Sequence, residues 1–326
     1  MVKFLIIRFS SIGDIVLTTP VIRCLKAQIP DVQIHYLTKK SFESILLPNP
    51  NVDKLHLLDD SLKTITDKLL TENFDYIIDL HHNLRSSIVK SRIKALSFSF
   101  DKLNFAKWLL VNFKLNILPD IHIVDRYMNT LRLFDISNDN KGLDFYINNA
   151  DMVDLQSLPI KFQKGYIGFV IGAKHNTKKL PVSKIVSIIK LTGLPAILLG
   201  GKGDITEASY IQTQLGELCY NACGKFSLAQ SASLVKQANV IITHDTGLMH
   251  IASAYKKKII SVWGNTVPRF GMYPYMPHPD SQIFEIKGLK CRPCSKIGYK
   301  KCPKEHFNCM NKIDCQGISD LAKKLF

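Results

Sequence analysis

Short apolar segments that alternate with helical stretches constrain the fold of this chain more than any other feature. The segments are rich in Ile, Val and Leu and mostly do not alternate with polar residues, which is typical of strands buried on both faces of a parallel sheet. They lie at 3–9, 33–38, 54–59, 75–81, 166–172, 195–200, 239–244 and 258–264. Stretches between them, such as 182–192 and 227–237, carry helical spacing. Because strand and helix alternate twice over, we expect two doubly wound α/β sheets.

The domain boundary is expected where polar residues cluster, near 147–163, just before a new strand begins at Tyr166. A chain of 326 residues is too long for one typical core and suits two domains of ordinary size. We therefore predict an N-terminal domain at 1–155 and a C-terminal domain at 156–326. The last stretch, 318–326, is predicted to be a short helix.

Hydrophobic residues make up 46% of the chain and charged residues 21%, as in soluble globular proteins. No uncharged apolar run of about 18 or more residues appears, so no membrane-spanning helix is expected. The N-terminal apolar run is short, Arg8 interrupts it, and no small-residue cleavage site follows, so it is predicted to be a strand rather than a signal peptide. The sequence thus favours a cytoplasmic protein whose eight cysteines are reduced.

The formal net charge is +16 at pH 7. Nucleic acid, an anionic membrane face and a phosphorylated small substrate all fit such an excess, and so does a basic composition that only serves solubility. Two segments concentrate the positive charge, 84–114 and 287–312. Within the first, 103–113 is apolar and aromatic, which suits either a membrane-facing helix or a helix with its apolar face in the core.

Asp14 follows the first predicted strand in RFSSIGDIVLTTP, residues 8–20. Ligands of open parallel sheets bind beyond the carboxyl ends of the strands, which is where Asp14 would lie. The same pattern fits a helix N-cap with Gly13 serving the turn, and the local pattern favours this capping interpretation. The loop lacks G-x-G-x-x-G and is a poor dinucleotide fingerprint.

Two loops of the second half have the residues of ligand-binding loops. LLGGKGD, 198–204, is glycine-rich but lacks the G-K-[ST] ending of a P-loop, so backbone approach to a ligand and a plain turn fit equally well. GAKHNTKKLP, 172–181, contains Lys174, His175, Lys178 and Lys179. These side chains would hold a phosphate, although a solvated basic loop is the commoner outcome.

THDTGLMH, 243–250, gathers polar groups where another predicted strand ends. Asp245 and Thr246 would begin a helix there, and Gly247 would let a ligand approach its first backbone N–H groups. Such a helix start is an anion site by its geometry and dipole. His250 lies one turn further on the same face. A capped helix with a buried histidine fits the same residues.

The C-terminal cysteines are closely spaced, as Cys291-x2-Cys294-x7-Cys302-x6-Cys309, with His306 nearby. Four thiols at such spacing can hold zinc. However, the second C-x2-C of common zinc sites is missing, and reduced structural thiols or a redox-labile pair fit as well. We therefore expect no metal to be required, and any metal here would be structural.

Two motifs stand out when the pieces are taken together: S-x-G-D-x-x-x-x-T-P at 11–20 and D-T-G-x-x-H-x-A-x-A at 245–254. With DYIIDLHHNLRS at 75–86, GAKHNTKKLP and the cysteine segment, the chain resembles glycosyltransferase family 9 over nearly its whole length. These are the bacterial ADP-heptose:lipopolysaccharide heptosyltransferases. The resemblance implies the GT-B fold, with two Rossmann-like domains facing a central cleft. It also implies a last helix, near 318–326, that packs back on the N-terminal domain.

The resemblance also implies roles for single residues. The N-terminal domain would bind the acceptor and the C-terminal domain the donor nucleotide-sugar. Asp14 occupies the place of the general base. Donor contacts are implied for Lys178, Asp245, Thr246, Gly247, Leu248 and His250. Acceptor contacts are implied for Ser10, Ser11, Gly13 and, more loosely, Arg85.

The implied reaction transfers a heptose from ADP-heptose to an inner-core sugar of lipopolysaccharide, with inversion. A carboxylate takes the proton of the attacking hydroxyl, and a lysine and a helix N-terminus meet the charge of the leaving diphosphate. No D-x-D occurs in the chain, so no metal clamp is apparent and no cofactor is expected beyond the donor.

The implied acceptor is anionic and lies at the cytoplasmic face of the inner membrane, which would account for the positive charge. We therefore expect peripheral membrane contact and no nucleic-acid partner. One alternative keeps the fold and changes the nucleotide-sugar or the glycan acceptor. A nicotinamide-dependent oxidoreductase is a more distant one, disfavoured by the missing G-x-G-x-x-G. A third alternative, a non-enzymatic nucleic-acid-binding protein, is suggested by the positive charge and by no other feature.

Overall fold

The computed structural model describes residues 1–59 and 61–326. The chain separates into two compact units: a first of 1–102 and 121–146, and a second of 103–120 and 147–326. The sequence led us to expect the division after residue 155. Residues 147–155 belong with the second unit instead, where the Val153 N–H donates to Ser233 Oγ at 2.9 Å.

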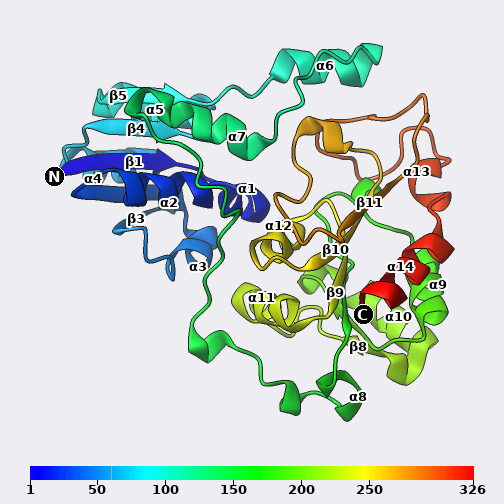
Figure 1. Cartoon of the computed structure of the whole chain (residues 1–326). Coiled ribbons are helices and arrows are strands. Elements are labelled where there is room, and N and C mark those ends of the chain that lie inside the picture. Colours follow the sequence, from blue (N-terminus) through cyan, green and yellow to red (C-terminus); the bar gives the residue numbers. More distant parts are fainter. Residues whose placement is uncertain (60) are drawn as a thin grey trace. The chain divides into compact units, whose positions relative to one another are not determined.

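The first unit contains a parallel sheet with the strand order β3-β2-β1-β4-β5 (Figure 1). Its strands are β1 (Val2–Ile7), β2 (Val32–Lys39), β3 (Lys54–Leu58), β4 (Tyr76–Asp79) and β5 (Leu96–Ser99). Its helices are α1 (Ile12–Val16), α2 (Thr19–Gln28), α3 (Glu43–Leu46), α4 (Leu62–Leu70), α5 (Leu84–Ile93) and α7 (Ile123–Met128). Leu5 and Ile7 of β1 pack in one core cluster with Val89 of α5, while α2 pairs with α7 on the opposite face.

The second unit contains a parallel sheet with the order β11-β10-β9-β6-β7-β8. Its strands are β6 (Ile167–Val170), β7 (Ala196–Leu199), β8 (Cys219–Asn221), β9 (Val240–His244), β10 (Lys258–Trp263) and β11 (Gln282–Glu285). Its helices are α6 (Asn104–Phe113), α8 (Ile160–Gln163), α9 (Val182–Thr192), α10 (Ile205–Leu215), α11 (Leu228–Gln237), α12 (Gly247–Ala254), α13 (Asn308–Asn311) and α14 (Cys315–Leu325). Two parallel α/β sheets, as the sequence predicts, are thus confirmed.

Short 3-10 turns connect several of these elements. They are η1 (Lys40–Phe42), η2 (Asn129–Phe134), η3 (Asn149–Asp151), η4 (Leu155–Ser157), η5 (Asn176–Lys178), η6 (Lys202–Asp204), η7 (Gly216–Leu218) and η8 (Pro268–Phe270). In the described part of the chain, no helix combines the length and the apolar character needed to cross a membrane.

Residues 103–120 leave the first unit and pack on the second. Ala106 and Leu110 of α6 are buried in a small core cluster with Phe270, and Leu118 completes it. The predicted N-terminal domain is therefore interrupted here, because the apolar face of α6 is covered by residues from far along the chain.

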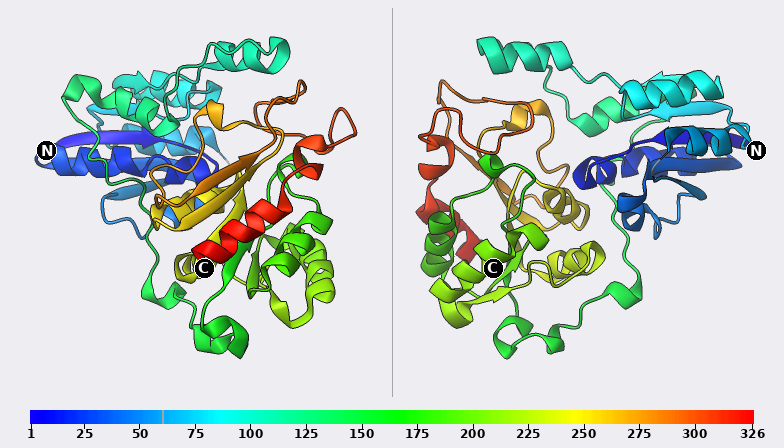
Figure 2. Two further views of the ribbon diagram at one scale, coloured as in Figure 1. Left: turned by 45° about the vertical axis from the view of Figure 1, so that its right-hand side comes forward. Right: turned by 180° about the vertical axis from the view of Figure 1, so that it is seen from behind.

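The C-terminal helix α14 lies beside α9 (Figure 2). Ile318, Ala322 and Leu325 are buried in the main core cluster of the second unit. The helix predicted at 318–326 therefore packs through its apolar face in the core of the second unit.

Candidate functional site

Asp14 lies on the first turn of α1, directly after the central strand β1. Arg8 Nη2 forms a salt bridge with its Oδ1 at 2.7 Å. Ser11 donates to its Oδ2 from the hydroxyl at 2.7 Å and from the backbone N–H at 3.1 Å. Ser11 is the N-cap, and Asp14 is the third helical residue that closes a capping box. The carboxylate is therefore held at both oxygens and stays 20% exposed.

Arg8 organises this site, although no sequence pattern predicts its role. It is 8% exposed and donates to Leu80 O and to Tyr127 Oη. Burial lowers the pKa of its guanidinium, but the charge of Asp14 and neighbouring groups outweigh burial, so the pKa is raised above its ordinary value. Arg8 is thus a permanent positive charge beside the Asp14 carboxylate.

His81 and Lys102 follow β4 and β5, at the same edge of the sheet. Burial, with the charges of Arg8 and Lys102, lowers the pKa of His81 to about 4, so the imidazole is neutral at pH 7. Its Nδ1 is buried, and among the described residues it has no hydrogen-bond partner. Burial and Arg8 also lower the pKa of Lys102. A neutral imidazole and a lysine beside a carboxylate suit a polar ligand at this edge.

The other residues predicted for the acceptor side divide into two groups. Ser10 and Gly13 act through their backbone carbonyls, which accept hydrogen bonds inside the loop and α1. Arg85 is exposed on α5 and lines another pocket, of about 330 Å³, with Lys39 and Lys40. The structure therefore brings Ser11 to Asp14 but places Arg85 in a separate basic pocket.

Lys178 and Asp245 meet in the second unit, beyond the carboxyl end of β9. Lys178 Nζ lies 2.6 Å from Asp245 Oδ2, and Thr266 Oγ1 donates to the same oxygen at 3.0 Å. The side chains of Lys178 and Asp245 are 17% and 11% exposed. Thr266 was not predicted, because it follows the next strand of the sheet and no local pattern links it to Asp245.

The start of α12 lies next to this pair. Thr246 is its N-cap, yet its side chain makes no capping bond, and Oγ1 is buried without a partner among the residues described. Gly247 is the first helical residue, Leu248 is half-buried and His250 is 2% exposed. A helix start without a side-chain cap, beside a lysine, has the geometry and the dipole of an anion site.

His244 is a structural residue rather than a ligand. It is fully buried, and its Nε2 accepts the Leu180 N–H at 3.0 Å. Burial, followed by the charge of Lys179, lowers the pKa of His244 to about 3. The imidazole is therefore neutral and fixes the loop that carries Lys178.

The glycine-rich loop at 198–204 encloses an internal carboxylate. A Cβ added at Gly200 would meet Asp204 Oδ2 and Cys223 Sγ at 2.9 Å. Asp204 in turn accepts from Lys179 Nζ at 2.6 Å and from the Gly201 N–H at 2.9 Å. Of the two alternatives for this loop, the structural turn is the one that its contacts support.

A family model described as glycosyltransferase family 9 (heptosyltransferase) matches residues 63–303. The lipopolysaccharide heptosyltransferase 1 of Campylobacter coli is 30% identical, over 81% of this chain and 84% of its own. The chain belongs to glycosyltransferase family 9.

Family 9 membership confirms the predicted enzyme class, a glycosyltransferase. A family 9 glycosyltransferase of Veillonella parvula superposes with a TM-score of 0.79 at 22% identity, covering 99% of this chain and 96% of that one. The E. coli ADP-heptose lipopolysaccharide heptosyltransferase II has a TM-score of 0.76 at 19% identity, covering 99% and 98%. The predicted fold class, GT-B with two Rossmann-like units, is confirmed.

Metal-ligating residue types gather at two places in this family 9 chain. The donor atoms of His35, His56 and Glu72 lie within 4.8 Å of one another. They already bond to protein groups, since His35 Nδ1 meets His56 Nε2 at 2.9 Å and Lys54 Nζ meets Glu72 Oε1 at 2.5 Å. The four C-terminal cysteines of the predicted thiol cluster line one small pocket.

Proposed function

We propose that this family 9 enzyme transfers a heptose from ADP-heptose to an inner-core sugar of lipopolysaccharide. The observation that carries the proposal is the Asp14 carboxylate, fixed by Arg8 and Ser11 beyond the central strand of the first sheet. The names of two similar proteins support the choice of donor and acceptor. The C. coli relative is called a lipopolysaccharide heptosyltransferase. The structurally similar E. coli protein is called an ADP-heptose lipopolysaccharide heptosyltransferase.

Asp14 acts as the general base. The acceptor hydroxyl loses its proton as its oxygen attacks the anomeric carbon, and a positioned carboxylate accepts that proton. The Arg8 ion pair and the Ser11 hydrogen bonds hold the carboxylate in one orientation. Direct displacement from the face opposite the leaving group inverts the anomeric centre.

Lys178 and the start of α12 receive the leaving diphosphate. Developing negative charge is stabilised best by donors that are already oriented. Asp245, itself bonded by Thr266, orients the Lys178 ammonium. The Thr246 hydroxyl and the first N–H groups of α12 supply further donors, and Leu248 and His250 complete the donor side. These groups play the part that a metal ion plays in a D-x-D clamp.

Helix α6 supports peripheral binding to the anionic inner-membrane surface. Phe105, Trp108 and Phe113 are 68%, 44% and 65% exposed. Their rings form a continuous row, with centroids 6.2 Å and 5.1 Å apart. The opposite face of α6 is buried. The two interpretations of this segment, a membrane-facing helix and a helix packed in the core, therefore each describe one face of α6. Exposed aromatic rings with nearby lysines suit the interface of an anionic bilayer, which supports the proposed binding at the cytoplasmic face.

The donor is tested by thermal-shift measurements with ADP-heptose and with GDP-, UDP- and dTDP-sugars, followed by transfer to a purified inner-core acceptor. We expect ADP-heptose to stabilise the protein and the acceptor to gain one heptose. Stabilisation by a UDP-sugar alone would remove ADP-heptose as donor and favour the alternative family 9 transferase.

Membrane contact is tested by sedimentation with vesicles. We expect binding to phosphatidylglycerol vesicles that falls several-fold in the double variant F105S/W108S, because the ring row loses its apolar area. Ile160, which is 81% exposed on α8, supplies the control I160S. Equal binding of all three proteins would exclude α6 as the contact surface.

A further inference from the structure

The segment between β11 and α13, residues 286–307, has no helix or strand, and the structure describes all of it. Irregular loops longer than about 12–15 residues are uncommon within a domain and need their own source of order. Eight Lys or Arg against one Glu at 287–312 add mutual repulsion to the cost of ordering it. The hydrophobic core supplies little order here, since most side chains of 286–307 are at least partly exposed.

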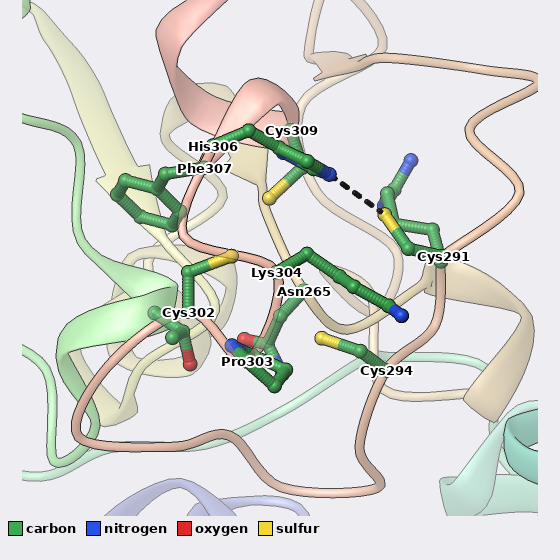
Figure 3. A pocket seen from close by; sticks show the side chains of 11 residues that line it. Asn265, Cys291, Cys294, Cys302, Pro303, Lys304, His306, Phe307 and Cys309 are labelled. Carbon is green, nitrogen blue, oxygen red and sulfur yellow. Dashed lines mark hydrogen bonds between the residues drawn. The ribbon is translucent and has the colours of Figure 1, made fainter.

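Cys291, Cys294 and Cys302 of this segment line one pocket together with Cys309 of α13 (Figure 3). Figure 3 shows the four sulfur atoms directed into the space between them. The pocket volume is about 10 Å³, which is the room of about one water-sized sphere. Four thiol sulfur atoms around a space for one atom or ion are the arrangement of a mononuclear metal site.

We propose that Cys291, Cys294, Cys302 and Cys309 bind one Zn²⁺ ion as a structural site. Four thiolates fill the tetrahedral shell of zinc and leave no position for substrate. In the described structure no three of these sulfur atoms all lie within 4.8 Å of one another. Because Zn–S bonds are about 2.3 Å long, the loop contracts around the ion when it binds.

His306 supports this ligand set from outside it. Its Nδ1 accepts the Asn308 N–H at 3.0 Å, so the imidazole proton lies on Nε2. Nε2 lies 4.0 Å from Cys291 Sγ. An N–H directed at a metal-bound thiolate is a common outer contact of such sites.

The positive charge of the segment matches the proposed ion. A zinc ion with four thiolates has a net charge of −2, and the surrounding lysines and arginines neutralise it. Lys304 lines the same pocket. Lys114 Nζ donates to Pro293 O at 2.7 Å, beside Cys294. The second basic segment of the chain is thus explained without nucleic acid.

The proposed site lies next to the donor-side residues. The Cys294 N–H donates to Asn265 O at 3.3 Å, and Arg292 Nη2 donates to Thr266 O at 2.8 Å. Thr266 in turn bonds to Asp245. A metal that orders 291–309 therefore also fixes the backbone that carries Thr266.

The test is metal analysis of the protein purified without chelators, by inductively coupled plasma mass spectrometry. We expect about one zinc per chain, loss of zinc in the double variant C302S/C309S, and full retention in C24S and C315S. Iron at the same stoichiometry would overturn zinc as the ion. Protein without metal, with the four thiols reactive or with a Cys291–Cys294 disulfide, would overturn the site.

The wild-type protein provides a second measurement in case the double variant fails to fold. A thiol-specific mercurial should release zinc in step with the modification of four thiols, and a strong chelator should lower the melting temperature. Zinc that stays bound after all four thiols are modified contradicts the proposal. All readouts are independent of sugar transfer, so they do not depend on the proposed donor.

Discussion

At the scale of single residues, Asp14 combines a proposed catalytic role with an ion pair. Asp14→Asn keeps the side-chain volume and the hydrogen bond from the Ser11 N–H but removes the base. We expect kcat to fall by about 100-fold or more with little change in KM, since general-base catalysis contributes about 10²–10⁴. The measurement is steady-state transfer of heptose, with circular dichroism to verify folding.

The matched control for Asp14→Asn is Asp139→Asn. Asp139 pairs with Arg23 at 2.8 Å in the same unit, so this variant also loses an Arg–Asp ion pair. It should retain nearly full kcat. If D14N kept more than about a tenth of the wild-type kcat, Asp14 would not be the base.

Lys178 makes a second prediction at this scale. Lys178→Gln removes the positive charge proposed to meet the diphosphate. Hydrogen bonds to charged groups contribute about 1.5–3 kcal/mol, so the affinity for ADP should fall at least about tenfold in calorimetric titration. Lys174→Gln, an exposed change on the same loop, is the control and should bind ADP like the wild type. Unchanged affinity in K178Q would exclude the lysine from the donor site.

Position after a strand marked the loops that carry Asp14, Lys178 and Asp245, but only the resemblance to family 9 selected these three residues. Position could not select their partners. His81, Lys102 and Thr266 follow other strands, and Arg8, although it follows the same strand as Asp14, has no local pattern that marks its ion pair. Local pattern says which residues leave the sheet at its carboxyl edge, but not which of them meet there. His244 shows the converse, since a polar residue at a strand end is fully buried.

At the scale of elements, the predicted strands are confirmed, including β3 at an edge of the first sheet. The apolar runs that we assigned all form strands, and the helix predicted at 182–192 matches α9. The sequence missed β5, β8 and β11, which are three or four residues long. Each lies at an edge of its sheet. An edge strand needs no unbroken apolar run, because one side of it is left uncovered.

The glycine-rich loop of the second unit allows a matched pair of substitutions. Gly200→Ala places a methyl group against Asp204 and Cys223, whereas a Cβ at Gly203 meets nothing within 4 Å. We expect G200A to destabilise the second unit by about 1–3 kcal/mol and G203A to have almost no effect. Trp108 and Trp263 both belong to this unit, so urea unfolding followed by tryptophan fluorescence reports on it. Equal midpoints for the two variants would contradict the seating of Asp204 in this loop.

At the scale of the whole molecule, each unit contains a histidine that folding keeps neutral. Burial lowers the pKa of His56 and His81 to about 4 in the first unit, and that of His244 to about 3 in the second. In the unfolded chain these groups titrate near pH 6.5. Between about pH 6.5 and pH 4 the unfolded chain therefore binds more protons than the native protein, so stability falls as the pH falls through this range.

We expect the free energy of unfolding at pH 5 to be lower than at pH 7 by about 1–2 kcal/mol for each of the three histidines. Because both units contain such a group, every unfolding transition seen by circular dichroism should move to lower urea concentration. His56→Gln should weaken the pH dependence of the first unit only, since His56 faces His35, Glu72 and Lys54 of that unit. A protein equally stable at pH 7 and pH 5 would show that these imidazoles take up protons as readily in the folded state as in the unfolded chain.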